Sequence, residues 1–547
     1  MTIPHAALAA RARSPWSLAL ALVLTLPLGG ACAVHPMRFV DRPPVTEIEA
    51  GTPVPLPAVR DVPPAAYISD AYLRHSLVSA LTTTRVPQPG DVNALDEVPP
   101  STWWNGPRSA ALPAVQAPVT EVDRPRLPLT ILPDATQAVR GGFAVRDARG
   151  VRWEIVRDPP DRPQMRTGAI MVATPLLRAL GWLVPHAVLL DTIPQDFTEP
   201  VRAVGLLIQG PPSSNDHHRV VAVRWPPFAG AGKAGETRLV ADVGDTPVSD
   251  RRLDDWNDLV AHRDRRTLRA LKVPGAWLGI KRLAPDNLRD VWVQEPGRVP
   301  RRGLLHHYIT GLELSLGADA VIRETDPQRS KEIDANTSRR LITLGLWPGG
   351  ELPPTQLEVR ALGELGSRVD ALGFGASPPF EPFDRCSPAD GYWAAVRLAA
   401  LPPDLVAKAL AAAAFTDPRA AATLQARLAA RRREVITRWL WAVTPLEVER
   451  IDATTLALID SGIRFEVFDA QLSTYRVEVL DDDGDILARI AVAGREGRVV
   501  VPWRPPGAVP DYLVVRIKVL RRGREASRPI EIHLRTDGKP RVVGIRR

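Results

Sequence analysis

Hydrophobic and polar residues alternate along the C-terminal part of the chain. After about residue 462, Tyr475, Val477 and Val479 are separated by single polar residues, and an Asp-Gly pair follows as a hairpin turn signal. Alternation with a period of two places apolar side chains on one face of a strand. The pattern returns in further runs at 486–492, 498–501, 512–519 and 530–534. We therefore predict a small antiparallel β-sandwich over residues 462–547.

Upstream of this region the pattern becomes helical. Between residues 390 and 442 apolar residues recur every three or four positions, as they do in amphipathic helices. Asp417 followed by Pro418 predicts a helix start, because proline fits the first helical turn. The spacing predicts a second helix over 166–181, and two short apolar runs around a polar turn predict a hairpin over 141–160.

Shorter elements are predicted between these segments. Residues 220–223 and 304–312 are apolar enough for buried strands, and residues 255–282 have helical spacing despite Pro274. Helices and strands thus occupy separate stretches of the chain, which indicates an α+β fold.

Proline is abundant, with 55 of 547 residues, or about twice the usual share. Many of these prolines lie in residues 34–135, and proline breaks helices and central strands. Apolar side chains, among them Trp103 and Trp104, are scattered through the same stretch. We therefore expect residues 34–135 to form an extended segment that wraps around a folded body.

The remaining composition excludes several classes of protein. An apolar share of 45% and a charged share of 24% exclude global disorder and fibrous repeats. The net charge is +8 and most basic residues are arginine, but no basic run carries interleaved aromatic residues, so we expect no nucleic-acid partner. The two cysteines, Cys32 and Cys386, exclude a disulfide framework and a four-cysteine zinc site.

Residues 1–33 have the pattern of a secretory signal. A short arginine-containing region precedes the apolar run Trp16–Leu28, which is too short to span a bilayer. Two processing routes fit: cleavage before Val34, or lipid modification of Cys32 as in bacterial lipoproteins. We expect an exported protein of the periplasm or outer envelope, held at the membrane by a lipid anchor if Cys32 is modified.

The familiar chemical motifs are incomplete in this sequence. The acidic run at 481–485 lacks the glutamate that a calcium loop needs at its twelfth position, where Val492 stands. The glycine-rich stretch before Lys233 is followed by Ala234 instead of the serine or threonine of a phosphate loop. The pattern alone therefore identifies no catalytic or metal site, and we expect no cofactor.

A set of short motifs occurs in a fixed order over about residues 91–440. They are Asp91–Pro100 with Trp103, Gly142–Gly150, Asp158–Pro160, Thr167–Ala169, Ala179–Gly181 with Val184 and Pro185, Leu268–Leu278, His307 and Tyr308 with Leu316 and Gly317, Tyr392 with Trp393, and Phe415–Arg419. Each motif is weak alone, but their order resembles that of a family of exported, mostly uncharacterised bacterial proteins with a protein-kinase-like core.

The resemblance implies a protein-kinase-like two-lobe body within an α+β chain. The signal at 1–33 and the Pro-rich segment at 34–135 would precede a β-rich N-lobe-like region at 136–254. A mainly helical C-lobe-like region at 255–445 would follow, and the small antiparallel β-sandwich at 462–547 would end the chain.

Kinase chemistry needs four charged groups: a strand lysine, a helix glutamate that holds it, a catalytic aspartate and a magnesium-binding aspartate. The resemblance places these groups at Val156, Ile170, Arg282 and Gly311, none of which has the required side chain. A fifth position, which binds magnesium in kinases, is kept as Asn287 and is a weak cofactor-binding candidate. The chain thus resembles a degenerate, pseudokinase-like member of the family.

These losses predict a catalytically inactive kinase-like protein that acts as a binding or scaffold module at the bacterial envelope, with an envelope protein or glycan as partner. One alternative is an active atypical phosphotransferase that uses the displaced residues Asp286, Asn287 and Glu313. Another is a surface carbohydrate- or protein-binding protein that acts through the sandwich, with Trp503 and Tyr512 as candidate exposed aromatics. For these two aromatics we favour core packing over exposure.

Overall fold

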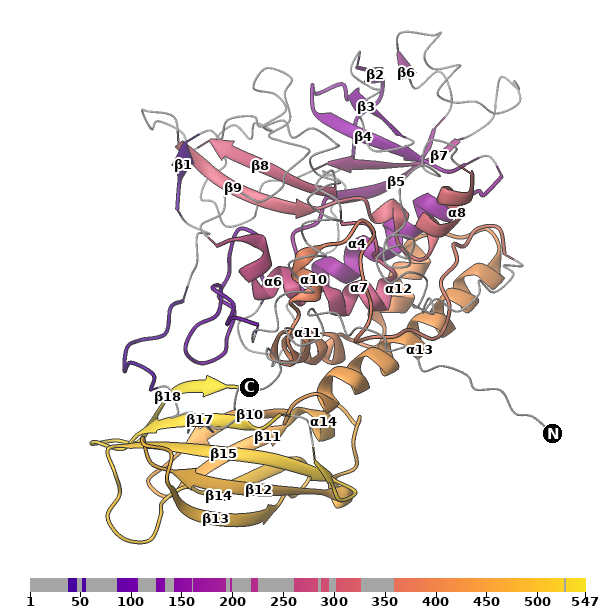
Figure 1. The fold of residues 1–547 in the computed structure, drawn as a ribbon. Coiled ribbons are helices and arrows are strands. Elements are labelled where there is room, and N and C mark those ends of the chain that lie inside the picture. The colour runs from indigo at the N-terminus through magenta and orange to yellow at the C-terminus, as the bar shows by residue number, and fades with distance from the viewer. Residues whose placement is uncertain are drawn as a thin grey trace, which may run out of the picture.

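The computed structural model describes the chain in separate stretches (Figure 1). These are residues 38–46, 52–55, 86–106, 124–132, 142–159, 161–192, 197–198, 218–224, 260–283, 287–294, 302–325, 359–525 and 528–547. The fold is α+β, as predicted, and most strand pairs are antiparallel. A sheet and a long hairpin lie at one end in Figure 1, helices occupy the middle, and further sheets form the other end.

The first sheet has the strand order β5-β7-β4-β3-β2-β6, and every pair is antiparallel except β2 with β6. Helix α4 (Met165–Ala179) packs against β4, β5 and β7. The predicted hairpin and the helix expected at 166–181 are confirmed, and so is the strand at 220–223. The strands are β2 (Leu129–Ile131), β3 (Gly142–Arg146), β4 (Arg152–Arg157), β5 (His186–Thr192), β6 (Phe197–Thr198) and β7 (His218–Arg224).

The β3–β4 hairpin shows why this sheet forms. Asp147 closes the turn, because its Oδ1 accepts hydrogen bonds from the backbone amides of Arg149 and Val151. Phe143 and Trp153 belong to the hydrophobic core on one face of the sheet. Val156, on the alternate face of β4, belongs to the core that contains α4. Both faces of β4 are therefore buried.

A second antiparallel hairpin follows, formed by β8 (Leu288–Gln294) and β9 (Arg302–Ile309), and β1 (Val54–Pro55) pairs with its outer edge. The strand expected at 304–312 is thus confirmed, although it ends at Ile309. The helix expected at 255–282 is divided: a 3₁₀ turn, η6 (His262–Asp264), precedes α6 (Arg266–Arg269) and α7 (Lys272–Leu278). Residues 251–259 lie outside the described residues.

Helices α10, α11, α12 and α13 share one hydrophobic core with α4 and α7, whereas α8 packs with Met165 and Leu314 in a separate small cluster. Ser387 and Asp390 form a reciprocal capping box at the start of α11, and Asp417 caps α13 as its sequence predicts. The helices are α8 (Ala318–Thr325), α10 (Glu381–Asp384), α11 (Pro388–Ala400), α12 (Leu405–Ala412) and α13 (Pro418–Trp441), with the 3₁₀ turn η8 (Leu312–Leu314) before α8.

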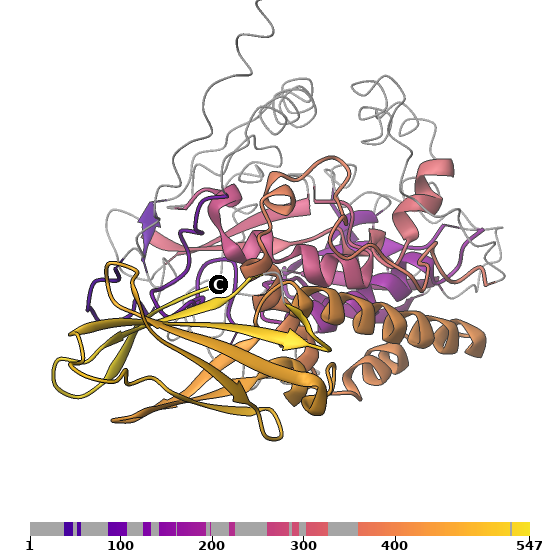
Figure 2. The same cartoon turned by 60° about the horizontal axis from the view of Figure 1, so that its bottom comes forward.

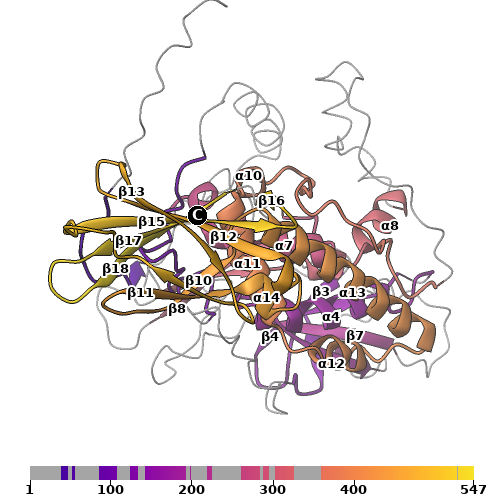
Figure 3. The ribbon, with the colours of Figure 1, turned by 90° about the horizontal axis from the view of Figure 1, so that it is seen from below.

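Two antiparallel sheets follow α13 and pack through a shared core. They lie beside the C-terminal end of α13 (Figure 3), at the opposite end of the structure from β3 and β4 in Figure 1, and Figure 2 shows them from a further side. The first sheet has the order β10-β11-β14, and the second has the order β13-β12-β15-β17-β18, with β16 paired to β15. The elements are β10 (Leu446–Ile451), β11 (Thr455–Asp460), α14 (Ser461–Arg464), η9 (Ala470–Leu472), β12 (Ser473–Leu480), β13 (Ile486–Ala493), β14 (Arg498–Pro502), β15 (Tyr512–Arg521), β16 (Arg524–Glu525), β17 (Ile530–Arg535) and β18 (Arg541–Arg546).

This C-terminal region begins earlier than the sequence predicts. Strands β10 and β11 precede residue 462, and Leu446, Leu456 and Leu458 contribute to the shared core. The expected start at 462 is therefore too late. The first of these strands follows almost directly on α13, which left no polar linker to mark the boundary.

The described stretches of the Pro-rich segment contact every other part of the structure. Phe39 packs with Tyr512 of the sandwich, and β1 pairs with β9. Trp103 and Trp104 are fully buried in the central core, and β2 belongs to the first sheet. Most of this segment has no regular secondary structure where it is described.

Candidate functional site

The two positions at which the resemblance would place a lysine and a glutamate lie in a hydrophobic core. Val156 of β4 is 0% exposed, Ile170 of α4 is 2% exposed, and both belong to the same cluster of buried apolar residues. Strand β4 and helix α4 are in contact, as the elements that carry the lysine and the glutamate must be. Val156 and Ile170 therefore contribute apolar packing to this contact, and neither side chain can form an ion pair.

The structure brings three of the other predicted positions together. The side-chain Nδ2 of Asn287 donates a hydrogen bond to the carbonyl oxygen of Arg282 at 3.0 Å, and the amide of Thr310 donates to the carbonyl oxygen of Asn287 at 2.8 Å. Thr310 leads directly to Gly311, so Arg282, Asn287 and Gly311 form one small buried site between α7 and η8.

Gly311 cannot be replaced by a carboxylate in this arrangement. Its φ of 73° lies in the left-handed region, and a Cβ atom there would stand 2.6–2.8 Å from three side-chain atoms of Asn287. An aspartate at this position would have to displace the Asn287 amide. The structure therefore has no space for a carboxylate at residue 311 unless the Asn287 side chain moves.

The displaced residues of the phosphotransferase alternative are only partly described. Asn287 is 6% exposed and Glu313, in the 3₁₀ turn after Gly311, is 2% exposed. Asp286 lies outside the described residues. Arg157, which neighbours Val156, is half-buried, and desolvation together with Arg166 lowers the pKa of its guanidinium.

The motifs that carry the resemblance contact one another at several points. Asp158 accepts hydrogen bonds from the backbone amide and the hydroxyl of Thr167 at 2.9 and 2.6 Å. A Cβ atom on Gly168 would stand 2.5 Å from the ring of Phe415, and one on Gly181 would stand 2.4 Å from Nε1 of Trp104. Close packing therefore accounts for the presence of these residue types at these positions, without any catalytic role.

Sequence reasoning missed a buried charged cluster between the Pro-rich segment, the helices and the sandwich. Arg266 of α6 donates to Asp96 at 2.6 Å and to Asp390 of α11 at 3.0 Å, and its side chain is 1% exposed. Arg547 donates to the other oxygen of Asp96 at 2.7 Å and lies 3.2 Å from Glu447. Asp96 lies in the first of the resemblance motifs, which was the signal available.

A second missed group joins the β8–β9 hairpin to the Pro-rich segment. Nδ1 of His307 lies 2.6 Å from Oδ1 of Asp290, and the ring of Trp103 stacks on the His307 ring with centroids 4.5 Å apart. The neighbouring His306 is also buried, and desolvation, with a smaller effect of His307, lowers its pKa to about 4. This arrangement fixes Trp103 against the hairpin.

The aromatic residues proposed for the sandwich are not exposed. Trp503 is 2% exposed and donates from Nε1 to the carbonyl oxygen of Asp452, and Tyr512 is 4% exposed. The core packing that the sequence favours for both residues is therefore confirmed, and neither forms part of an exposed binding surface. Burial, with Asp390 adding to it, raises the pKa of the Cys386 thiol, as is typical of an unreactive structural cysteine. Cys32 lies outside the described residues.

Neither a metal centre nor a membrane helix is found in the described part of the chain. No group of three histidine, cysteine, aspartate or glutamate side chains there could hold a metal ion. None of the helices described is both long and apolar enough to span a bilayer. Comparison with known proteins gives no match to any family model, curated protein or solved structure.

Proposed function

We propose that this chain is an exported, catalytically inactive kinase-like protein that acts as a binding or scaffold module at the bacterial envelope. The observation that carries the proposal is the burial of Val156 and Ile170 in one apolar core where β4 meets α4. A lysine and a glutamate there would hold the phosphates of a nucleotide. Val156 and Ile170 stabilise the contact between β4 and α4 by apolar packing, but neither side chain has a charge that could bind a phosphate or a lysine.

The arrangement around Asn287 supports the same proposal. A magnesium ion bound between phosphates needs oxygen ligands, usually including a carboxylate. Here Gly311 contributes no side chain, so residue 311 supplies no carboxylate ligand. Arg282 in turn carries a positive charge where the catalytic aspartate would accept a proton, so it cannot act as that base.

The packing of the motif residues explains how such a chain keeps its fold. Contacts such as Asp158 with Thr167 and Gly168 with Phe415 are independent of nucleotide chemistry. A protein that retains these contacts keeps a stable surface for a partner, which we take to be an envelope protein or a glycan. An atypical phosphotransferase is the second candidate, and it would require Asn287 and Glu313 to become accessible to nucleotide.

A phosphotransfer assay tests this proposal. The purified protein is incubated with γ-labelled ATP, Mg²⁺ and a mixture of envelope proteins, beside the Asn287→Ala variant. We expect label transfer and ADP release in the wild type to equal those of the variant. Magnesium-dependent transfer that the variant lacks would instead establish the atypical phosphotransferase.

Export and membrane attachment form a separate part of the proposal. The pattern of residues 1–33 and the position of Cys32 support a signal with a lipid anchor. A Cys32→Ser variant expressed in a bacterial host should then leave the membrane fraction without detergent. If that variant stays with the membrane, the lipid anchor at Cys32 is excluded.

A further inference from the structure

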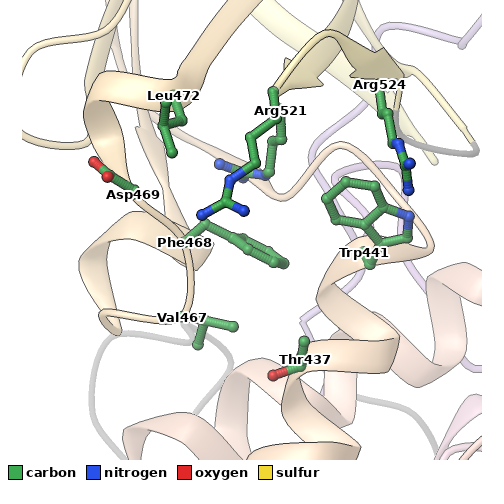
Figure 4. Close-up of a pocket in the computed structure, with 9 residues that line it drawn as sticks. Thr437, Trp441, Val467, Phe468, Asp469, Leu472, Arg521 and Arg524 are labelled. Carbon is green, nitrogen blue, oxygen red and sulfur yellow. The ribbon is translucent and has the colours of Figure 1, made fainter.

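A cavity of about 590 Å³ lies where the helices meet the sandwich (Figure 4). Its walls come from the end of α13, from the loop between α14 and β12, and from the turn that joins β15 to β16. This volume is within the range of sites for small organic ligands, which are common at domain junctions. The sequence pattern gives no sign of it, because the three walls are far apart along the chain.

One side of the cavity is aromatic and apolar. Trp441, at the end of α13, and Phe468 form an edge-to-face pair with ring centroids 5.8 Å apart. Val467 and Leu472 extend this surface, and Leu472 is 40% exposed. Rings fixed in this way provide a surface on which a planar group can stack.

A rigid arginine connects the apolar side to the charged side. Arg521 is buried, its guanidinium lies 4.1 Å from the ring centroid of Phe468, and it donates to Ser473 at 2.7 Å. The same guanidinium donates to both carboxylate oxygens of Asp460 at 2.8 and 3.0 Å. Asp460 therefore neutralises Arg521, which acts as a wall of the cavity rather than as a free cation.

Arg522 and Arg524 differ from most arginines on the sandwich surface. Several of those pair with carboxylates, for example Arg476 with Glu525 and Arg498 with Glu449. Arg522 and Arg524 are exposed, and within the described residues neither forms an ion pair. Two cations without an internal partner thus stand at one rim of an aromatic cavity.

The one acidic residue among the lining side chains is already engaged. Oδ1 of Asp469 accepts a hydrogen bond from the amide of Gln471 at 2.9 Å, which caps the 3₁₀ turn η9. Figure 4 shows its carboxylate directed away from Arg521 and Arg524, whereas Arg524 is directed toward Trp441. The charged side of the cavity therefore favours an anion.

We propose that this cavity binds a small organic anion that carries a planar apolar group. The carboxylate, sulfonate or phosphate of such a ligand would be held by Arg522 and Arg524, since guanidinium groups bind these anions through paired hydrogen bonds. The planar group would stack against Trp441 and Phe468. This site is separate from the buried site around Asn287 and does not depend on the proposed lack of catalysis.

A fluorescence titration with 8-anilinonaphthalene-1-sulfonate, a planar sulfonate, tests the proposal. We expect the double variant Arg522→Ala/Arg524→Ala to raise the Kd for this probe at least tenfold. The control Arg495→Ala/Arg504→Ala removes the same charge from exposed sandwich arginines that do not line the cavity, and it should change the Kd less than twofold. Equal binding by the two double variants overturns the proposal.

Two further measurements distinguish the effects of the ligand's charge and ring from non-specific hydrophobic binding. The uncharged analogue N-phenyl-1-naphthylamine should bind at least tenfold more weakly than the sulfonate, and equally tight binding overturns the role of the arginines. Trp441→Ala should weaken the sulfonate while near-ultraviolet circular dichroism remains that of a folded protein. If the loss of Trp441 leaves the Kd unchanged, the ring does not stack there and the proposal fails.

ATP is an anion that carries a planar adenine ring, so it is titrated in parallel. Binding that Arg522→Ala/Arg524→Ala removes and Asn287→Ala leaves intact supports the cavity and leaves the proposed lack of catalysis untouched. ATP binding that Asn287→Ala removes and Arg522→Ala/Arg524→Ala leaves intact argues against the inactive kinase-like protein. It does not affect the interpretation of the sulfonate titration.

Discussion

The guanidinium of Arg521 donates hydrogen bonds to both carboxylate oxygens of Asp460, at 2.8 and 3.0 Å, with both side chains buried. Asp460 also accepts from the Tyr475 hydroxyl at 2.7 Å and caps α14 through the amides of Gly462 and Ile463. This single carboxylate therefore links β11, β12, β15 and α14. It lies at the point where the sandwich meets the helices.

Replacing Asp460 with asparagine should destabilise the sandwich strongly. Asparagine can still cap α14, but it leaves the Arg521 guanidinium buried without a counter-charge, which typically costs about 3–5 kcal/mol. Urea unfolding followed by circular dichroism measures the change. Asp537→Asn, which removes an exposed partner of Arg535, is the matched control and should leave the unfolding midpoint unchanged. Similar midpoints for both variants would contradict the role of Asp460.

Introducing a lysine on β4 should damage the fold without producing nucleotide binding. Val156→Lys places an ammonium group in an apolar core, and we expect it to lower the free energy of unfolding by about 3 kcal/mol or more. Arg157→Lys changes the adjacent residue, which is half-buried on the other face of the strand, and should change stability by less than about 1 kcal/mol. A stable Val156→Lys variant that binds ATP would show that the core is less closed than described.

Stability should fall in mild acid through His533. Desolvation, assisted by Arg546 and Arg516, lowers the pKa of this buried histidine to about 4, so it is neutral in the fold. Because the unfolded histidine titrates near 6.5, its contribution is complete above pH 6.5 and is lost as pH falls toward 4, by about 3 kcal/mol in all. His306 acts in the same direction.

The variant His533→Asn isolates this effect. Asparagine retains a polar atom for the hydrogen bond with the Tyr512 hydroxyl, which lies 3.0 Å from Nδ1 of His533. The free energy of unfolding of the His533→Asn variant should therefore depend less on pH between 4 and 6.5 than that of the wild type. Identical pH profiles for the two proteins would exclude His533 as a source of acid sensitivity.

The local elements of this fold were predictable, and the long-range partners were not. The β3–β4 hairpin, helix α4 and the Asp417 cap depend on spacing within a few residues, which periodicity reports. Arg521 and Asp460 are 61 residues apart, and Asp91 and Arg266 are 175 apart. Nothing in a periodic pattern selects such partners, so the charged cluster and the junction cavity were missed.

The candidate site shows the same division. The resemblance identified Arg282, Asn287 and Gly311 as related positions, and the structure places them together. A carboxylate at residue 311 would need space that Asn287 occupies. The sequence could not show this, because the close approach of Asn287 and Gly311 depends on two separate segments. The exposed role considered for Trp503 failed because this residue follows β14 and packs inward, where its Nε1 donates to the carbonyl oxygen of Asp452.

Asp91 should hold the Pro-rich segment on the helices. Its carboxylate accepts from the amide of Arg266 and from the amide and hydroxyl of Thr267, all at the start of α6. Asp91→Ala leaves these buried donors without their acceptor. We expect the free energy of unfolding to fall by about 3 kcal/mol and proteolysis within residues 86–106 to become faster. Asp370→Ala removes a similar acceptor from an exposed turn and should leave the cleavage rate unchanged. Equal cleavage of the two variants would show that Asp91 does not anchor the segment.

Thermal unfolding with ATP and Mg²⁺ tests the central claim most directly. A ligand at 100 times its Kd stabilises a folded protein by about 2.7 kcal/mol, which a melting curve detects readily. We predict that Mg²⁺ with ATP produces no rise in Tm that depends on Asn287, so that wild type and Asn287→Ala respond alike. A magnesium-dependent rise in the wild type that Asn287→Ala abolishes would contradict the account of an inactive kinase-like protein.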